Sequence, residues 1–591
     1  MTIRVLMLED RASGASTTYA EGSQYDLPEA TAALYIHNRW ATYVSGDLVP
    51  NDAVPVSAQI DPVTGGVGIS SGGVTIQLSP SGDSAGVTDR VALQRAHDAL
   101  PASGGVIALS QGVFYLNAEV TITKTVKIEG AGGGISGDGS TVDAFAPTTI
   151  KCLSATENGF NVSADGCTFR DFALINTSVS VPTAGAGILA MANNTATIDA
   201  LTVQGFWNNL DLQGCYYSVT NCKIYDAANF YLYIHRPANA SYNDHGDMIV
   251  ANNVLSAWKT NRTAAAQLRW ESGGGLKCIG NKFNNGYQVG NPTAGVAQYC
   301  VQLLVADGCA TGSMIFTGNS ISGNVANIAN MYVGLKGPSK TGRLVNLHIV
   351  GNEIPVGNQG ITIEGDSAHD DALRGINISD NMFSTLTTSS IKLRYVRQCR
   401  IGRNFHNSSV GGPLIDIPDL VSNIVGLAID KQHVSEITSK DIVRDNRAVG
   451  NVVSAFTGGV EYDYTHGAVI STNGVWTQIF KIEVTNSIAG KLQLDIDARS
   501  TDTGNTAGNR KGVTIRQERA FDVSSAGVVT LTTIGTDVAA GAAAAFVAVR
   551  YTLTANWIAV EVQTTDATNC VLWGPVRLRV DGKLQTFHVG T

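Results

Sequence analysis

The stretch Ile279-Gly280-Asn281-Lys282-Phe283 recurs in varied form along the middle of the chain. Weaker copies extend the series in both directions, and the position of Asn281 is matched at 172, 201, 222, 253, 319, 352, 381 and 404. Repeats of this size with Gly and Asn at their corners are typical of a solenoid, in which each unit buries its apolar side against the next. We expect Asn to adopt the positive φ of a tight corner, and the stacked amides to hydrogen-bond in a ladder. The clearest copies are Phe316-Thr317-Gly318-Asn319-Ser320-Ile321, Val350-Gly351-Asn352-Glu353-Ile354 and Ser379-Asp380-Asn381-Met382-Phe383.

A second segment with alternating apolar and polar residues lies between these markers, for example Leu268-Arg269-Trp270-Glu271. Period-two alternation places Leu, Ile and Trp inside and aligns the polar side chains on one outer face. This face is the first candidate for a functional surface. Its polar residues are Asp211, Tyr233, His235, Arg269, Glu271, Gln302, Glu364, Lys392 and Arg394.

Length and composition limit the function classes. The 591 residues predict several domains, and 64 glycines with only 15% charged residues favour β-structure. A net charge of −9 argues against a nucleic-acid partner. There is no apolar run of membrane-spanning length and no signal peptide, so we expect synthesis in a cytosol without membrane insertion.

Cysteine usage supports the same picture. The nine cysteines form an odd number without a CxxC pair, which favours buried reduced thiols over disulfides or a metal site. Asp370-Asp371 and Asp244-His245 could hold a cation, but nothing near them resembles a calcium loop. We expect no cofactor and no metal.

The chain divides into four predicted parts. Residues 1–46 predict a small module with a strand at 3–8 and a helix at 27–40, and residues 47–82 read as an extended linker rich in Gly, Ser and Pro. The repeats occupy 83–435. Residues 440–591 contain turn-separated strands that suggest an antiparallel β-sandwich.

The start of the repeat region carries a family resemblance. An amphipathic helix at 90–100 precedes Gly104-Gly105-Val106-Ile107-Ala108-Leu109, then Gly112-Val113-Phe114-Tyr115-Leu116, then a strand that ends in Gly130-Ala131-Gly132. This order resembles the opening of pectate-lyase-like right-handed parallel β-helix proteins, so we expect an all-β chain with a right-handed parallel β-helix. The helix would close the open end of the apolar stack.

The whole arrangement resembles bacteriophage tailspike proteins. The resemblance implies a homotrimer located in the phage tail, made in the host cytoplasm and attached through its N-terminal module to a virion tail or baseplate protein. It further implies a bacterial surface polysaccharide as the partner: capsule, exopolysaccharide or O-antigen. The signatures of pectate lyases and polygalacturonases are not assembled here, which disfavours pectin chemistry.

Candidate catalytic residues follow from the needs of glycoside hydrolysis. Two carboxyl groups must lie about 5 Å apart for retention of configuration, or about 6.5–9.5 Å for inversion. Rungs about 4.8 Å apart supply such distances. Glu364 and Asp366 form the favoured pair, because Asp370 and Asp371 add negative charge that would raise one carboxyl pKa by repulsion. Arg394, one rung away, could offset an excess of negative charge; the alternative is a solvated acidic loop.

A second cluster comprises Glu271 and Asp307 as reserve catalytic residues, with His235, Tyr233 and Arg269 beside them. An Arg, a His and a Tyr near a Glu also suit a polysaccharide lyase, in which Arg neutralises a uronate. The alternative is an outward ion pair with ordinary surface aromatics, on a non-catalytic adhesin. The expected substrate-binding residues are His235, Tyr233, Arg269, Arg394, Tyr395, Asp370 and Asp371, and Tyr242 and Tyr287 are further candidate sugar platforms.

Overall fold

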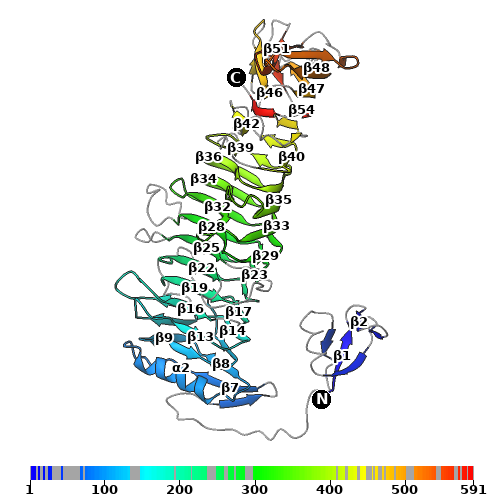
Figure 1. Ribbon diagram of the computed structural model, residues 1–591. Helices are drawn as coiled ribbons and strands as arrows, with labels where there is room; N and C mark the ends of the chain where they lie inside the picture. Colours follow the sequence, from blue (N-terminus) through cyan, green and yellow to red (C-terminus); the bar gives the residue numbers. More distant parts are fainter. Residues whose placement is uncertain are drawn as a thin grey trace, which may run out of the picture. The chain divides into compact units, whose positions relative to one another are not determined.

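The structure is a computed structural model that describes most of residues 73–591 and, before them, only short strands (Figure 1). The residues after 73 that it leaves undescribed are 134–146, 192–194, 215, 236–247, 258–263, 272–273, 286–296, 408–409, 419–423, 435–439, 447–454, 457–458, 464–468, 472–473, 485–487, 501–511, 541–546, 565–569, 573–574, 582–583 and 590–591.

The chain separates into two compact units, Met1–Ile76 and Gln77–Thr591. In the first unit, β1 (Thr2–Met7) pairs antiparallel with β4 (Gln24–Pro28) and β5 (Ala41–Tyr43), and β2 (Arg11–Ser13) pairs with β3 (Thr17–Tyr19). The predicted strand at 3–8 is therefore confirmed. The predicted helix is wrong at its start, because Leu27 and Pro28 pair with Ile3 and Thr2 in the sheet. Its remainder, 29–40, lies outside the described residues, and the predicted boundaries at 46 and 82 stay predictions.

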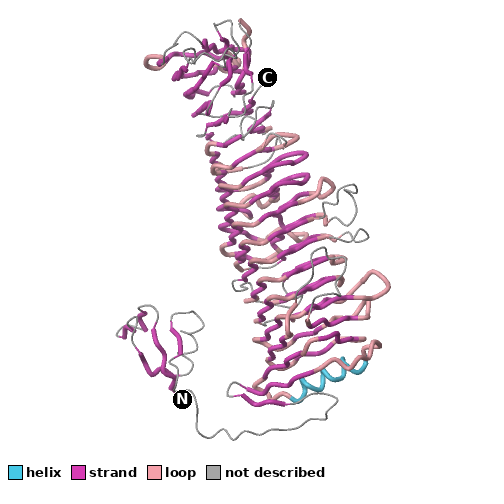
Figure 2. Tube along the Cα trace, turned by 180° about the vertical axis from the view of Figure 1, so that it is seen from behind, coloured by secondary structure: helices cyan, strands magenta, loops and turns pink. Residues whose placement is uncertain are grey.

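The second unit begins with the predicted closing helix. Helix α2 (Val87–Ala99) is the one helix among the described residues, and it lies at the end of the stack (Figure 2). The side chain of Leu93, on this helix, is fully buried. The carboxylate of Asp89 accepts the backbone N–H of Ser81 at 2.8 Å and of Tyr115 at 2.9 Å, which ties the helix to the first coil. The helix thereby covers apolar residues that would otherwise face water.

A right-handed parallel β-helix follows, as predicted, and its strand pairings form three sheets. The first sheet is built from one strand of each coil, and all its members pair parallel. These strands are β8 (Gly105–Leu109), β11 (Val126–Glu129), β14 (Cys167–Arg170), β17 (Ala196–Asp199), β20 (Ser218–Thr220), β23 (Met248–Ala251), β26 (Leu276–Ile279), β30 (Met314–Thr317), β33 (Arg343–Val350), β35 (Leu373–Ser379), β37 (Arg397–Ile401), β40 (Ala428–Ile429) and β43 (Ala455–Phe456).

The strands of the second sheet are β9 (Gly112–Leu116), β12 (Thr148–Cys152), β15 (Ala173–Asn176), β18 (Thr202–Gln204), β21 (Lys223–Tyr225), β24 (Val254–Ser256), β27 (Lys282–Asn284), β31 (Ser320–Ser322), β34 (Glu353–Glu364), β36 (Met382–Arg394), β38 (Phe405–His406), β41 (Gln432–Val434) and β44 (Gly459–Asp463). In this sheet, each strand from β15 to β38 begins directly after a marker position of the repeat.

The third sheet carries the alternating segments singled out in the sequence. The long strands β34 and β36 turn the corner and contribute to both the second and the third sheet. The other members are β10 (Val120–Ile122), β13 (Phe160–Val162), β16 (Ala186–Ala190), β19 (Asn208–Gln213), β22 (Phe230–His235), β25 (Ala266–Glu271), β28 (Tyr299–Val305), β32 (Ala329–Leu335), β39 (Ile415–Ile417) and β42 (Lys440–Asp445).

The register of the third sheet aligns apolar residues with apolar residues on adjacent strands. Leu210, Leu232 and Leu268 face one another on adjacent strands. Their side chains are fully buried, as is Trp270, which the alternation placed inside. A shift by one residue would exchange the buried and the outward set, so the apolar column fixes which residues face solvent.

Six buried asparagines form a ladder at the corner between the first and second sheets. The Nδ2 of each of the first five donates to the Oδ1 of the next asparagine over 2.9 to 3.1 Å. The Oδ1 of each of the last five also accepts the backbone N–H of the preceding asparagine, and that of Asn253 accepts the backbone N–H of Cys222. Each Nδ2 donates to a backbone carbonyl as well. The predicted amide ladder is confirmed for Asn253, Asn281, Asn319, Asn352, Asn381 and Asn404.

The positive φ of these corners lies one residue earlier than predicted. It belongs to Asn252 (58°), Gly280 (65°), Gly318 (64°), Gly351 (67°) and Asp380 (56°), all exposed. The marker asparagine points into the stack to reach its partners, so its solvent-facing neighbour takes the left-handed conformation. Gly, Asn and Asp are the residue types that tolerate it.

The C-terminal strands change to antiparallel pairing. The strand β42 pairs parallel with β39 on one side and antiparallel with β55 on the other. The third sheet of the β-helix is therefore continuous with a sheet of the sandwich. One layer contains β46 (Thr477–Val484), β51 (Val547–Thr554), β52 (Trp557–Thr564) and β55 (Leu584–Val589). The other contains β45 (Val469–Ser471), β47 (Ile488–Ser500), β48 (Gly512–Val523), β49 (Val529–Thr533), β50 (Val538–Ala540), β53 (Cys570–Leu572) and β54 (Pro575–Asp581).

Both layers contribute to one apolar core. Phe480 and Phe587 meet edge to face at 6.1 Å between ring centroids, and Leu494 and Leu578 of the other layer are fully buried. The predicted antiparallel β-sandwich is confirmed. The seven cysteines whose side chains the structure describes are buried, and none of them forms a disulfide bond. In the described part of the chain, no helix is long and apolar enough to cross a bilayer.

The ladder predicts a large loss of stability for Asn352→Ala. The substitution removes four hydrogen bonds, to Asn319 (two), Phe316 and Asn381, and leaves buried polar groups without partners. At about 1–3 kcal/mol for each unsatisfied group, we expect the free energy of unfolding in guanidinium to fall by roughly 3 kcal/mol or more. The control is Asn377→Ala on the outer side of β35, with an expected change below about 0.5 kcal/mol. Equal effects of the two substitutions would contradict a structural role for the ladder.

Candidate functional site

The candidate site lies on the outer side of the third sheet. We call the outward side chains of β19, β22, β25, β28, β32, β34, β36 and β39, together with Lys336 directly after β32, the site face. Two columns run along it. One contains Asp211, Tyr233, Arg269, Gln302, Tyr332, Thr362, Lys392 and Asp416, and the other contains Gln213, His235 and Glu271 and, beyond the rung of Leu304, Gly334, Glu364 and Arg394.

Glu271 is the most enclosed acid of the site face, with a side chain only 4% exposed. Its Oε1 accepts the Nε of Arg269 at 2.5 Å. Its Oε2 accepts the hydroxyl of Tyr233 at 2.8 Å and also pairs with Lys336. Burial acts to raise the pKa of Glu271, but the hydrogen bond from Lys336 and the charge of Arg269 outweigh it and hold this pKa below its ordinary value. The carboxylate is thus ionised and fully occupied by protein donors.

Asp211 and His235 form a second pair beside Glu271. The Nε2 of His235 lies 2.7 Å from Oδ1 of Asp211, and Asn208 donates to Oδ2 at 2.8 Å. The rings of Tyr233 and His235 stack at 3.9 Å. Burial first, and then the charge of Glu271, raises the pKa of Tyr233, so this phenol stays protonated near neutral pH.

Glu364 is more open, with 30% of its side chain exposed. It pairs with Arg394 on the next rung and accepts the hydroxyl of Tyr332 at 3.4 Å. Tyr299 lies beside Tyr332, with ring centroids 5.4 Å apart. The pKa of Tyr299 is raised by burial and, more weakly, by Glu364, while Arg269 opposes the shift. These two tyrosines therefore connect the surroundings of Glu271 and Glu364 into one continuous surface.

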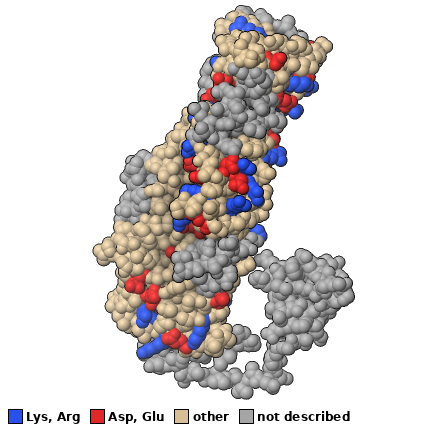
Figure 3. Space-filling view, viewed as in Figure 1, with Lys and Arg blue, Asp and Glu red and all other residues tan. Residues whose placement is uncertain are grey.

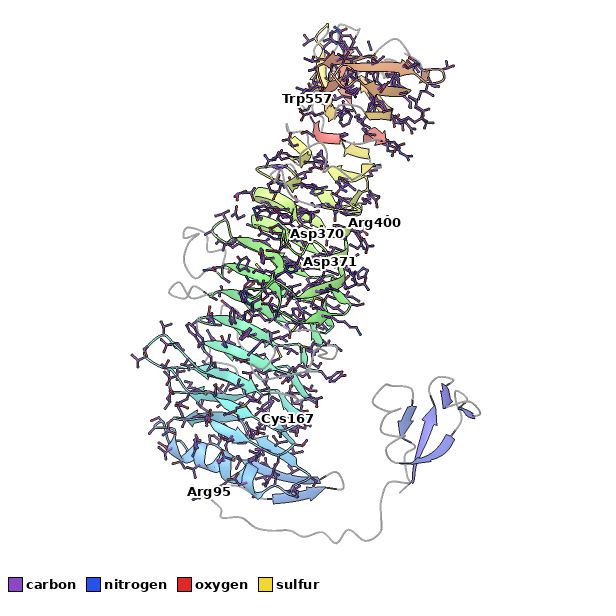
Figure 4. All side chains as sticks on the ribbon, in the orientation of Figure 1. Arg95, Cys167, Asp370, Asp371, Arg400 and Trp557 are labelled. Atoms are coloured by element: carbon purple, nitrogen blue, oxygen red, sulfur yellow. The ribbon has the colours of Figure 1, made fainter. Side chains whose placement is uncertain are left out.

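The acidic loop after Glu364 carries internal partners. Asp366 accepts the backbone N–H of Ala368 at 2.9 Å and lies 3.6 Å from His369. Asp370 receives two hydrogen bonds from Arg397, at 2.8 and 2.9 Å, and Asp371 lies 3.8 Å from Arg343. Figure 4 labels Asp370 and Asp371, and Figure 3 shows acidic and basic side chains side by side over the middle of the stack. Asp370 and Asp371 thus each lie beside an arginine, which reduces the repulsion that the sequence argument assigned to them.

Asp307 is engaged in a turn. Its two oxygens accept the backbone N–H groups of Ser339 and Thr341, each at 3.0 Å. It thereby fixes the loop that begins with Lys336, the partner of Glu271. Neither of these two hydrogen bonds joins Asp307 to a residue of the site face. The catalytic role of Asp307 stays a prediction.

The remaining candidates lie in different places. Tyr395 directly follows β36, next to Gly365 on the neighbouring rung, since a Cβ on Gly365 would meet the carbonyl of Tyr395 at 2.2 Å. Tyr242, Tyr287 and the loop at 243–247 lie outside the described residues. Within the described residues, no group of three or more His, Cys, Asp or Glu side chains is placed to hold a metal ion.

Sequence reasoning missed Lys336, Tyr332 and Tyr299 as members of the site. The segment Met331-Tyr332-Val333-Gly334 alternates like its neighbours, and this was the available signal. This segment has no charged residue at an outward position, so the sequence did not mark it as part of a functional surface. Asp211 was placed on the outer face but not linked to His235, because the sequence does not give the side-chain conformations that bring them together.

No family model and no curated protein sequence matches the chain. Among solved structures, the tailspike protein gp49 of the Acinetobacter baumannii bacteriophage Fri1, described as a capsular polysaccharide depolymerase, is 12% identical, with a TM-score of 0.29 and coverage of 85% of this chain and 84% of that one. The Dettilon tailspike protein is 11% identical, with a TM-score of 0.37 and coverage of 86% and 94%. Full-length tailspike protein 2 of the Escherichia coli O157:H7 bacteriophage CAB120 is 10% identical, with a TM-score of 0.36 and coverage of 98% and 87%. Each of these three structures is a phage tailspike, the class of protein that the sequence resembles.

The surroundings of Glu271 predict a pH-dependent contribution to stability. A carboxyl whose folded pKa is lowered stabilises the protein fully above its ordinary pKa, and this contribution disappears as the pH falls through the lowered folded value. Glu271→Gln also leaves Arg269 and Lys336 without their anion. We expect Glu271→Gln to cost about 3 kcal/mol at neutral pH, and the difference from the wild type to shrink towards pH 3 in guanidinium titrations. Glu353→Gln, an exposed acid on β34, is the control, and a difference for Glu271→Gln that stays constant with pH would contradict this prediction.

Proposed function

We propose that this chain is a phage tailspike depolymerase that binds and cleaves a bacterial surface polysaccharide by endo-glycoside hydrolysis. The observation that carries the proposal is the site face itself. Acidic, basic and aromatic side chains repeat along it from rung to rung, on strands whose register is fixed by buried columns. With rungs about 4.8 Å apart, such a face suits a long polar polymer with a regular repeat.

Glu364 and Asp366 are the proposed catalytic carboxyl groups, as acid and base or as acid and nucleophile. The 30% exposed side chain of Glu364 is accessible to a ligand, whereas that of Glu271 is 4% exposed. Tyr332 and Tyr299 next to Glu364 offer rings on which the apolar face of a sugar packs. Glu271 is the reserve, and its saturation with donors suits it better to holding Arg269 and Lys336 in place.

The runner-up activity is a polysaccharide lyase. Its support is the group of Arg269, Lys336, His235 and Tyr233, in which the cations could neutralise a uronate. Against Tyr233 as the base stands its raised pKa, which results from burial and the charge of Glu271. The third possibility is an adhesin, in which the same side chains only hydrogen-bond sugar hydroxyls.

Assembly into a homotrimer, and attachment of the N-terminal module to a virion tail or baseplate protein, are proposals that rest on the tailspike resemblance. The C-terminal sandwich would help to hold the trimer together, or would itself bind carbohydrate. Light scattering of the full chain tests the trimer: we expect the molar mass of three chains, and the molar mass of a stable monomer would contradict the proposal.

The test of function is incubation of the full chain with purified capsule, exopolysaccharide and O-antigen preparations. Hydrolysis releases new reducing ends, and a lyase produces the ultraviolet absorbance of an unsaturated uronate. General acid–base catalysis contributes roughly 10²–10⁴-fold, so we expect Glu364→Gln and Asp366→Asn each to lower turnover by about that factor while binding persists. Glu353→Gln on the same strand should be unaffected.

Three other outcomes would change the assignment. Near-normal turnover in both variants would move the site to Glu271, Asp307 and His235. The ultraviolet absorbance of an unsaturated uronate, without products of hydrolysis, would make the chain a lyase. Tight binding with unchanged polymer length would make it an adhesin.

A further inference from the structure

The acids of the site face are each compensated by a basic side chain of the protein. Glu271 pairs with Arg269 and Lys336, and Glu364 pairs with Arg394. Asp211 pairs with His235, and Asp416 lies 3.0 Å from the Nε of Arg444 on β42. The site face therefore has no uncompensated acid among these residues.

Lys392 is different. It stands on β36 with Thr362 and Asp416 directly opposite on the neighbouring strands. Asp416 pairs with Arg444 instead, and Thr362 donates to Gln359 at 2.8 Å. Within the described part of the chain, Lys392 makes no hydrogen bond and no ion pair, although it is partly buried.

An unpaired cation in this place needs a physical reason. The chain has 40 basic and 49 acidic residues, so carboxylates are abundant as partners. The described part of the protein gives the ammonium of Lys392 no anionic partner, and an anion that arrives with a ligand would form a charge-assisted hydrogen bond with it. Lys392 lies two residues from Arg394, the partner of Glu364, and one rung beyond the strand of Glu364. A ligand group held by Lys392 would thus lie beside the proposed catalytic acid.

We propose that Lys392 binds an anionic substituent of the polysaccharide, so that the substrate is an acidic glycan. The group is a carboxylate of a uronic acid or a phosphodiester, each of which presents oxygen acceptors to one ammonium. The inference rests on the proposed function for its setting, and it adds the chemical class of the sugar. The rings of Tyr299 and Tyr332 then hold the sugar while Lys392 fixes its charged substituent.

Acylation of individual lysines in the full chain tests the contact directly. The protein is treated with an acetylating N-hydroxysuccinimide ester in sodium glucuronate, in glucose 1-phosphate, or in glucose with sodium chloride at the same ionic strength. Mass spectrometry gives the rate at each lysine. We expect glucuronate to slow acylation of Lys392 at least threefold if the ligand is a carboxylate, or glucose 1-phosphate to do so if it is a phosphate. Lys282, exposed on β27, is the internal control and should not change. Equal rates for Lys392 in all three solutions would overturn the proposal.

A second measurement separates this proposal from the proposed function. The polysaccharide that the wild type cleaves is compared with the same polymer after reduction of its carboxyl groups or removal of its phosphate. We expect at least tenfold weaker binding of the neutral polymer to the wild type, a much smaller difference for Lys392→Gln, and recovery in Lys392→Arg, with Lys282→Gln like the wild type. Equal binding of the charged and the neutral polymer would contradict the proposal that the substrate is acidic, and it would not affect the proposal that the chain is a depolymerase. Failure to bind or cleave any polysaccharide would overturn the function itself.

Discussion

The structure depends on a buried hydrogen-bond ladder. Six asparagines, from Asn253 to Asn404, each satisfy both the backbone and the amide of the neighbouring rung. A buried amide that lacks a partner is costly, so the ladder permits one alignment of neighbouring coils and disfavours all others. Apolar columns such as Leu210, Leu232 and Leu268 enforce the same alignment from inside. The outer side chains inherit this order, and a surface with a regular repeat results.

Charge compensation gives the site face its chemical character. Glu271 and Glu364 stand three rungs apart in the third sheet, yet their surroundings differ. Glu271 is enclosed by Arg269, Lys336 and Tyr233, which keeps it ionised and rigid. Glu364 has one cation and one distant hydroxyl and remains open to solvent. Enclosure suits a residue that organises its neighbours, whereas openness suits one that meets a ligand.

The repeats determined how much the sequence could predict. The periodic positions gave the coils, the inward Trp270 and the outer columns, because each follows from local alternation that many rungs repeat. The closing helix followed from the order of motifs at the start of the repeat region. Features that depend on single loops were not readable: Asp366 accepts a backbone N–H of its own turn, and Asp307 accepts two backbone N–H groups of the loop that follows β32. Lys336 was missed for the same reason, since it reaches Glu271 from a loop. Leu27 and Pro28 suited a helix start by propensity, but pairing with β1 overrode that preference.

The central claim is that a polysaccharide lies along the site face. Hydroxyl-radical footprinting of the full chain, with and without a polysaccharide that it retains, tests this claim most directly. The account predicts reduced oxidation of Tyr299 and Tyr332, and unchanged oxidation of Tyr115 on β9 and of Tyr551 on β51. Protection confined to Tyr551 and its neighbours in the sandwich, with Tyr299 and Tyr332 unchanged, would contradict it.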